Sequence, residues 1–207
     1  MTMNFTNVQT ETDPIPAELL ARYSKLPTAN VADAMGRLGA LDSRIKPVWP
    51  GATVVGPAYT VWTRAGDNKV LHEALGLAAP GDVLVVNGEA DESRALLGEL
   101  MGERAKVNGL AGFVVDGAIR DAEVLAEIPM PVFARAVTPA GPFKHGPGKL
   151  NGAIAVGGVA VMPGDLVLGD SDGVVIVPKA DVEHILVAAE TKFADETARR
   201  ADIKAGR

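Results

Sequence analysis

The sequence of 207 residues contains no cysteine. Disulfides, thiolate nucleophiles, iron–sulfur clusters and zinc–thiolate sites are therefore excluded. Aromatic residues make up only 4% of the chain, so its core has to be built from aliphatic side chains. Because 47% of the residues are hydrophobic, the composition is that of a globular protein and not of a disordered chain.

The sequence also lacks an excess of positive charge and any long apolar run. Lys and Arg number 20 against 26 Asp and Glu, which gives a net charge of −6. A track for nucleic-acid phosphates needs clustered Lys and Arg, so we expect no nucleic-acid partner. No apolar run approaches the ~20 residues that span a bilayer, and residues 1–14 lack the features of a signal peptide. We therefore expect a cytoplasmic protein with no membrane partner.

The apolar spacing predicts helices and strands that alternate along the chain, followed by several short strands and a last helix. Helices are expected at residues 16–26, 28–35, 68–77, 92–108, 121–127 and 179–205. Strands are expected at residues 51–64, 83–86, 113–115, 132–134, 153–156, 159–161, 166–168 and 174–177. This order favours a layered α/β sandwich over a Rossmann fold, since no G-x-G-x-x-G motif opens a helix after a strand.

The most informative stretch is residues 109–121. Its apolar strand is predicted to run into a turn at Asp116 and Gly117, which delivers Arg120 and Asp121 to the start of a helix. Ligands collect where strand ends feed helix starts in α/β folds. A guanidinium beside a carboxylate can hold an anionic ligand and a cation together. The structural alternative is that Asp121 caps the helix and Arg120 pairs with Glu123.

Gly98 lies inside the predicted helix over residues 92–108. Glycine in a helix interior costs about 1 kcal/mol relative to alanine, so Gly98 is expected to mark a helix start. The N–H groups from Glu99 to Met101 would then be unpaired and could hold an anion. A kink or close packing inside a longer helix is the alternative.

Two other polar groups carry less information. The acidic loop over residues 169–173 lacks the remaining ligands of a calcium loop, so a tight turn between two strands is the better interpretation. His72, His145 and His184 are too far apart in sequence to suggest a pair of metal ligands. We interpret them as ordinary surface or core residues, and Thr28 as the cap of the second helix.

Taken together and in this order, several segments resemble the RraA-like family. They are residues 28–35, 98–101, 112–121, 131–134 and 169–178. That family contains 4-hydroxy-4-methyl-2-oxoglutarate aldolases, which also decarboxylate oxaloacetate, and regulators of ribonuclease E activity. Many of its members were once labelled menaquinone-pathway methyltransferases. The resemblance covers roughly residues 25 to 178.

The resemblance implies a layered α/β/β/α sandwich of the swivelling-domain type with a C-terminal helix. We expect a single domain over residues 1–207. It would consist of a helical lead over residues 1–27, a core over 28–178 and a final helix over 179–207 that packs on a neighbouring subunit. The family further implies a homotrimer or homohexamer whose active sites lie at subunit boundaries.

The resemblance also assigns site residues. The loop that binds the substrate carboxylate through backbone amides corresponds to Gly98, Glu99, Leu100 and Met101. Arg120 corresponds to the substrate-binding and catalytic arginine, and Asp121 to the direct metal ligand. Glu99 stands where the aldolases usually carry Asp, whose side chain reaches the metal through water. Glu196 on the final helix corresponds to a glutamate that reaches a neighbour's site, or else is a solvated charge.

Without thiols or paired histidines, the metal ligands must be oxygens, so the expected cofactor is Mg²⁺ or Mn²⁺. The implied activity is a class II pyruvate aldolase that cleaves 2-oxo acids through a metal-stabilised enolate and also decarboxylates oxaloacetate. Arg120 would neutralise the developing charge, and a water held by Glu99 is the candidate base. No lysine falls in these motifs, which disfavours Schiff-base chemistry. The competing hypothesis is a non-catalytic regulator that docks on a ribonuclease.

Overall fold

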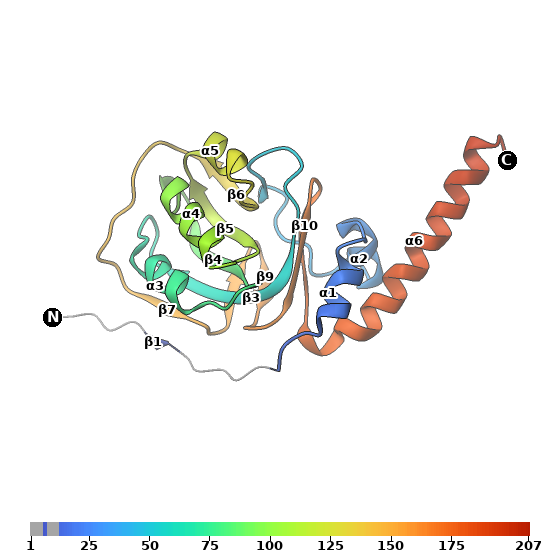
Figure 1. Cartoon of the computed structure of the whole chain (residues 1–207), viewed down its shortest axis with the longest axis horizontal. Coiled ribbons are helices and arrows are strands. Elements are labelled where there is room, and N and C mark those ends of the chain that lie inside the picture. The colour runs from blue at the N-terminus through green and yellow to red at the C-terminus, as the bar shows by residue number, and fades with distance from the viewer. Residues whose placement is uncertain (1–5, 8–12) are drawn as a thin grey trace.

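The computed structural model describes residues 6–7 and 13–207 and shows helices on both sides of two packed sheets (Figure 1). The helices are α1 (Ala17–Tyr23), α2 (Thr28–Ala34), α3 (Lys69–Leu77), α4 (Glu99–Val107), α5 (Ala122–Glu127) and α6 (Val182–Lys204), with a 3₁₀ turn η1 (Lys179–Asp181) before the last. The strands are β1 (Thr6–Asn7), β2 (Lys46–Pro47), β3 (Val54–Thr63), β4 (Val83–Ala95), β5 (Gly112–Ile119), β6 (Val132–Val137), β7 (Gly148–Leu150), β8 (Ile154–Val156), β9 (Val159–Val161), β10 (Leu166–Asp170) and β11 (Gly173–Val177).

The main sheet has the strand order β1-β7-β3-β4-β5-β6-β2, and β3 to β6 are parallel to one another. Strand β3 belongs to two sheets. Residues 54–57 pair antiparallel with β10, whereas residues 58–62 pair with β4. The β10–β11 hairpin therefore forms a second sheet that continues from the first through β3. Val83, Val85 and Val114 are fully buried, as expected for central parallel strands covered on both faces.

Three hydrophobic clusters fill the spaces between the layers. The first joins α3, α4 and α5 to the main sheet and includes Leu71, Leu125 and Phe113. The second lies between the two sheets and includes Val114 and Val167. The third joins the outer face of β10 and β11 to α1, α2 and α6. This arrangement confirms the predicted α/β/β/α sandwich with a C-terminal helix.

The structure corrects the predicted helix over residues 92–108. Strand β4 continues to Ala95 with irregular pairing, and the helix begins only at Glu99. Glu89 and Ala90 have positive φ, and the strand bends at these two residues, just before the charged segment over residues 91–94. The helical periodicity of residues 92–97 was therefore misleading. The prediction that Gly98 marks a helix start is confirmed.

Two further local predictions were wrong. The turn expected at Asp116 and Gly117 is strand, because β5 runs to Ile119 and all its residues are buried. Thr28 does not cap α2. Its N–H and hydroxyl both donate to the carboxylate of Asp170, at 2.9 and 2.7 Å, so a residue distant in sequence covers this helix end. The tight turn expected at residues 169–173 is confirmed as the β10–β11 hairpin.

Helix α6 contacts the body through its first half only. Arg22 of α1 donates from Nε to Glu190 Oε1 at 2.8 Å, and from Thr191 onward every residue is exposed. The second half extends away from the body (Figure 1). None of the helices in the described residues combines the length and apolar character that a membrane span requires. The predicted lead over residues 1–27 lies partly outside the described residues.

A buried ion cluster joins neighbouring strands of the main sheet to two loops. The Arg135 side chain on β6 is 4% exposed and pairs with Asp116 on β5 and with Asp42, the latter at 3.1 Å. Asp116 also accepts the N–H of Gly157, next to β8, at 2.6 Å. Arg135 contacts both carboxylates, and Asp116 also binds Gly157, so the cluster ties four segments of the chain together.

The loop before β7 is anchored by Asp67, whose side chain is fully buried. The N–H groups of His145 and Gly146 donate to its Oδ2 at 2.9 and 2.6 Å, and the N–H of Lys69 donates to Oδ1 at 3.0 Å. Burial alone would raise the pKa of Asp67, but these hydrogen bonds and the nearby Arg64 charge favour the carboxylate and lower its pKa below the ordinary value.

Replacing Arg135 with methionine should strongly destabilise the protein. Removing the cation leaves the Asp116 carboxyl group in the core without its ion-pair partner, which costs about 3–5 kcal/mol in comparable buried pairs. Urea unfolding followed by circular dichroism measures the change. Arg44→Met is the matched control, because Arg44 is the exposed partner of Asp42 and its loss should barely move the midpoint. Equal, small shifts for both variants would show that the cluster contributes nothing to stability.

Asp67→Asn should lower stability at neutral pH by about 1–3 kcal/mol, because charge-assisted hydrogen bonds to three backbone N–H groups are weakened. The folded pKa of Asp67 lies below its unfolded value of about 3.9, so its contribution is complete above that pH and is lost as pH falls through the folded pKa. The two proteins should therefore converge in stability as the pH falls below that unfolded value and through the folded pKa. Asp33→Asn, at an exposed ion pair on α2, is the control, and a pH-independent gap for Asp67→Asn would contradict the assignment.

Candidate active site

The first turn of α4 lies beside the turn between β5 and α5. The N–H of Arg120 donates to the carbonyl of Leu97 at 3.0 Å, and the N–H of Glu99 donates to Asp121 Oδ2 at 3.2 Å. A backbone bond and a side-chain bond therefore hold the two turns together. The structural alternatives for Asp121 and Arg120 are wrong, since Asp121 makes no side-chain cap bond to its own helix and Arg120 pairs with Asp121.

Arg120 and Asp121 form one unit. The distance from Arg120 Nε to Asp121 Oδ2 is 3.3 Å, and both side chains remain partly exposed. The backbone of Asp121 is left-handed, with φ of 58°, a conformation that is uncommon for residues other than glycine. This conformation ends β5 and turns the carboxylate back toward α4, so local backbone strain accompanies the placement of the side chain.

Gly98 makes this contact possible. A Cβ atom at residue 98 would collide with Asp121 Oδ2 and would lie 2.9 Å from Arg120 Cγ, closer than carbon atoms pack. The backbone of Gly98 is extended, with φ of −155°, so its requirement for glycine comes from space and not from conformation. The absence of a side chain thus lets a carboxylate reach the first amide of α4.

The amides of α4 differ from the sequence prediction. The sequence predicted unpaired N–H groups at Glu99, Leu100 and Met101. Of these, only the Leu100 N–H has no acceptor among the described residues. The Glu99 N–H donates to Asp121, and the Met101 N–H donates to the carbonyl of Gly98 at 3.1 Å. The prediction that all three are unpaired is therefore wrong, because the first helical turn closes on itself and a carboxylate covers its end.

A cavity of about 330 Å³ opens next to this unit. It is lined by Asn68, His72, Ala95, Leu96, Leu97, Gly98, Glu99, Leu100, Met101, Arg120, Gly141, Pro142 and Lys144. Five predicted site residues therefore line the same cavity. Gly98, Glu99, Leu100 and Met101 precede β5 in the chain, and Arg120 follows it. Asp121 adjoins the cavity through its contacts with Glu99 and Arg120. The cavity volume suits a small organic acid.

The loop before β7 forms another wall of the cavity. Arg94 Nη1 donates to the carbonyl of Gly141 at 2.9 Å, and its guanidinium lies 4.2 Å from the ring centre of Phe143. Arg64 lies over the same ring at 5.8 Å. These cation–π contacts, with the Asp67 anchor, keep Gly141 and Lys144 beside Arg120.

Sequence reasoning missed Asn68, His72 and Lys144 as cavity residues. They come from the start of α3 and from a glycine- and proline-rich loop, which no motif linked to Arg120. Partial burial, with the charges of Lys144 and Arg104 nearby, lowers the pKa of His72, so its ring is neutral at pH 7. The sequence analysis interpreted His72 as an ordinary surface or core residue, whereas the structure places it in the cavity wall.

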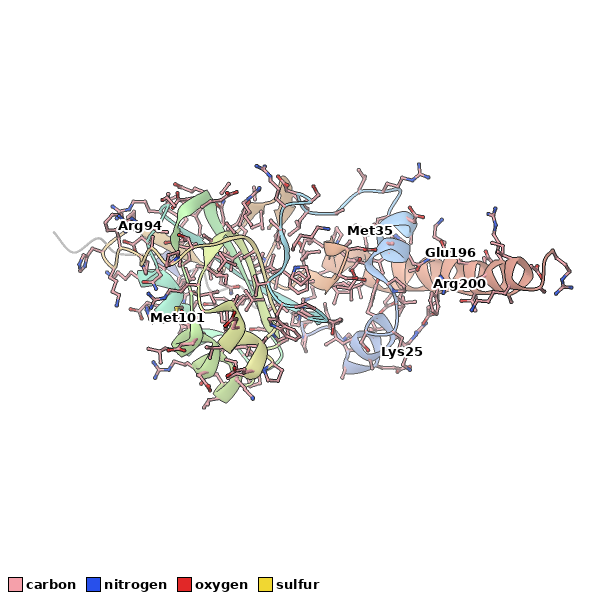
Figure 2. All side chains as sticks on the ribbon, turned by 90° about the horizontal axis from the view of Figure 1, so that it is seen from above. Lys25, Met35, Arg94, Met101, Glu196 and Arg200 are labelled. Atoms are coloured by element: carbon pink, nitrogen blue, oxygen red, sulfur yellow. The ribbon has the colours of Figure 1, made fainter. Side chains whose placement is uncertain are left out.

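Glu196 does not belong to the site of its own chain. It lies on the exposed half of α6, and Figure 2 shows it on the side of the molecule away from Met101. Among the described residues, no group of three or more His, Asp and Glu side chains could hold a metal ion. Asp121 and Glu99 are the carboxylates that one chain places at this cavity. The roles assigned to the site residues stay predictions.

Comparison with known proteins gives the family of the chain. The model of the family described as RraA-like, Aldolase/RraA, matches residues 28–176. A protein of Halalkalibacterium halodurans with the provisional name 4-hydroxy-4-methyl-2-oxoglutarate aldolase is 42% identical over 186 residues, which cover 90% of this chain and 89% of that protein.

Solved structures share the fold. The Streptomyces coelicolor protein RraAS2, described as an unusual member of the RNase ES inhibitor RraA family, superposes with a TM-score of 0.82 at 30% identity, over 91% of this chain and 99% of its own. The RNA-processing inhibitor RraA from Thermus thermophilis has a TM-score of 0.68 at 35% identity, over 74% of this chain and 93% of its own. With the family model matched across both the Gly98 turn and the Arg120–Asp121 pair, the chain belongs to the RraA-like family.

Proposed function

We propose that this protein is a divalent-metal-dependent carbon–carbon lyase that releases pyruvate from 4-hydroxy-4-methyl-2-oxoglutarate and decarboxylates oxaloacetate. The observation that carries the proposal is a pair of contacts at the edge of one small cavity. Asp121 pairs with Arg120 and accepts a hydrogen bond from the first amide of α4. The provisional name of the 42% identical relative supports an aldolase.

The cavity suits the carboxylate of a 2-oxo acid. The Leu100 N–H is unpaired in the described residues, and it lies at the positive end of the α4 dipole. Arg120 adds a full positive charge that is 45% exposed and so free to meet a ligand. An anionic group between them gains both a hydrogen bond and charge neutralisation.

Asp121 fits the role of a ligand for a hard cation. Its Oδ2 is engaged by the Glu99 N–H and by Arg120, whereas no described residue donates to Oδ1. Mg²⁺ commonly takes one or two protein carboxylates and fills its remaining positions with water and substrate oxygens, so a single aspartate suffices. When bound, the cation would supply Lewis acidity at the 2-oxo group.

The protein side chains divide the remaining work. Cleavage breaks the bond between C3 and C4, removes the proton of the 4-hydroxyl and leaves negative charge on the 2-oxo oxygen. Arg120 stabilises that charge because its guanidinium is already in place and needs no reorganisation. The Glu99 carboxylate, which makes no ion pair within the described residues, holds the water that accepts and returns the proton.

Helix α6 supports an assembly. Its exposed second half gains nothing in an isolated chain, and packing on a second copy would cover it. We extend the proposal to a trimer or hexamer in which Glu196 reaches the site of a neighbour. The Glu196 carboxylate would then be a second protein oxygen beside Asp121, within the one or two carboxylates that Mg²⁺ commonly takes.

The activity should depend on a metal and on the Arg120–Asp121 pair. Pyruvate release from both substrates should disappear with EDTA and return with Mg²⁺ or Mn²⁺. Arg120→Ala and Asp121→Ala should each lower kcat/KM by about 100-fold or more, with an unchanged elution volume in gel filtration. Glu127→Ala, at an exposed position on α5, is the control. Turnover at the wild-type rate in either site variant would refute the assignment.

Gly98→Ala should impair activity without unfolding the protein. The added methyl group displaces the carboxylate of Asp121 from the Glu99 amide, so kcat/KM should fall by about 10-fold or more. Gly76→Ala is the matched control, because no atom lies within 4 Å of a Cβ at that helical position. It should leave turnover unchanged and slightly raise the melting temperature. An active Gly98→Ala protein would show that this contact is dispensable.

A non-catalytic regulator is the second candidate. It is supported by the similarity to structures of RNA-processing inhibitors, at 30 to 35% identity. The same substrate assays separate the two functions. Failure to release pyruvate from any 2-oxo acid, together with tight binding to a ribonuclease in calorimetry, would favour the regulator.

A further inference from the structure

Asn68 lines the candidate cavity but has no part in the proposed chemistry. The residue is 5% exposed and directly precedes α3. Its backbone N–H donates to the carbonyl of Phe143 at 3.0 Å, which fixes its position against the loop before β7. Its Nδ2 donates to Met101 Sδ at 3.7 Å. The side chain is therefore directed toward the first turn of α4.

The Oδ1 atom of Asn68 is a buried acceptor with no donor. In the part of the chain that the structure describes, no other buried side-chain nitrogen or oxygen lacks a partner. Asparagine before a helix ordinarily accepts an N–H from the first turn, but Asn68 makes no such bond. An unpaired buried acceptor costs stability, and such exceptions in folded proteins call for an explanation. A ligand that donates a hydrogen bond in the cavity provides one.

We propose that Asn68 Oδ1 accepts a hydrogen bond from the 4-hydroxyl group of the substrate, which makes Asn68 a specificity-determining residue. The inference rests on the proposed function. In 4-hydroxy-4-methyl-2-oxoglutarate the two ionised carboxylates and the 2-oxo oxygen can only accept hydrogen bonds. The 4-hydroxyl is the single donor of the molecule, and it is attached to the carbon at which the chain is cleaved.

The bond selects one reaction over the other. Oxaloacetate in its keto form has no hydroxyl and leaves Oδ1 unpaired, so the site disfavours it relative to the hydroxy acid. A carboxamide is not basic enough to remove the hydroxyl proton. The hydroxyl has one proton, so Asn68 Oδ1 and the water held by Glu99 share it in a three-centre hydrogen bond. Asn68 orients the hydroxyl, and the water removes the proton.

Asn68→Leu is the test, because leucine has nearly the same size and lacks both polar atoms. With Mg²⁺ present, kcat/KM for cleavage of 4-hydroxy-4-methyl-2-oxoglutarate should fall by about 10-fold or more. Decarboxylation of oxaloacetate should stay within about 2-fold of wild type or increase, because the unpaired acceptor is gone. Asn68→Ala cannot clash with Met101 and should show the same change in selectivity, so the test survives if the leucine variant does not fold.

Met101→Leu separates recognition from support. It removes the Sδ contact of Asn68 but keeps the Oδ1 atom. If Asn68 merely supports the first turn of α4, the variants at both positions lower the two rates in parallel, and the inference is overturned. Wild-type protein that releases pyruvate from neither substrate would refute the proposed function itself. Parallel losses in an otherwise active protein would refute only the role of Asn68.

Discussion

The candidate site depends on one contact, between the carboxylate of Asp121 and the first amide of α4. It joins the end of a parallel strand to the start of the neighbouring helix, two points that are 22 residues apart in the chain. Three features permit it, namely the missing side chain of Gly98, the left-handed backbone of Asp121 and the bond from Arg120 to Leu97. Together they hold a carboxylate and a guanidinium side by side with polar atoms still available.

The contact also determines which groups remain available to bind an anionic ligand. Because Asp121 already occupies the Glu99 amide and Gly98 accepts from Met101, the helix offers a single free N–H. An anionic ligand must therefore rely on Arg120 for most of its recognition. The first amide of the helix serves instead to hold the carboxylate of Asp121 in place.

The sequence predicted the layers and the position of the Arg120–Asp121 pair, because both depend on local patterns. Apolar spacing identified α3, β5 and the β10–β11 hairpin, and the cost of an internal glycine identified the start of α4 at Glu99. It failed where distant residues override local preference. Asp170 covers the end of α2 from across the fold, and a bent β4 absorbs residues that have helical spacing. The cavity wall built by Asn68 and residues 141–144 was missed for the same reason, since only tertiary contacts bring those segments to Arg120.

The strand shared by both sheets has a mechanical consequence. Because β3 pairs with β10 at one end and with β4 at the other, the two sheets cannot slide past each other without breaking a continuous backbone ladder. A load on the outer hairpin is therefore transmitted along β3 to the strands beneath α3 and α4. The cavity is therefore mounted on a stiff frame of strands.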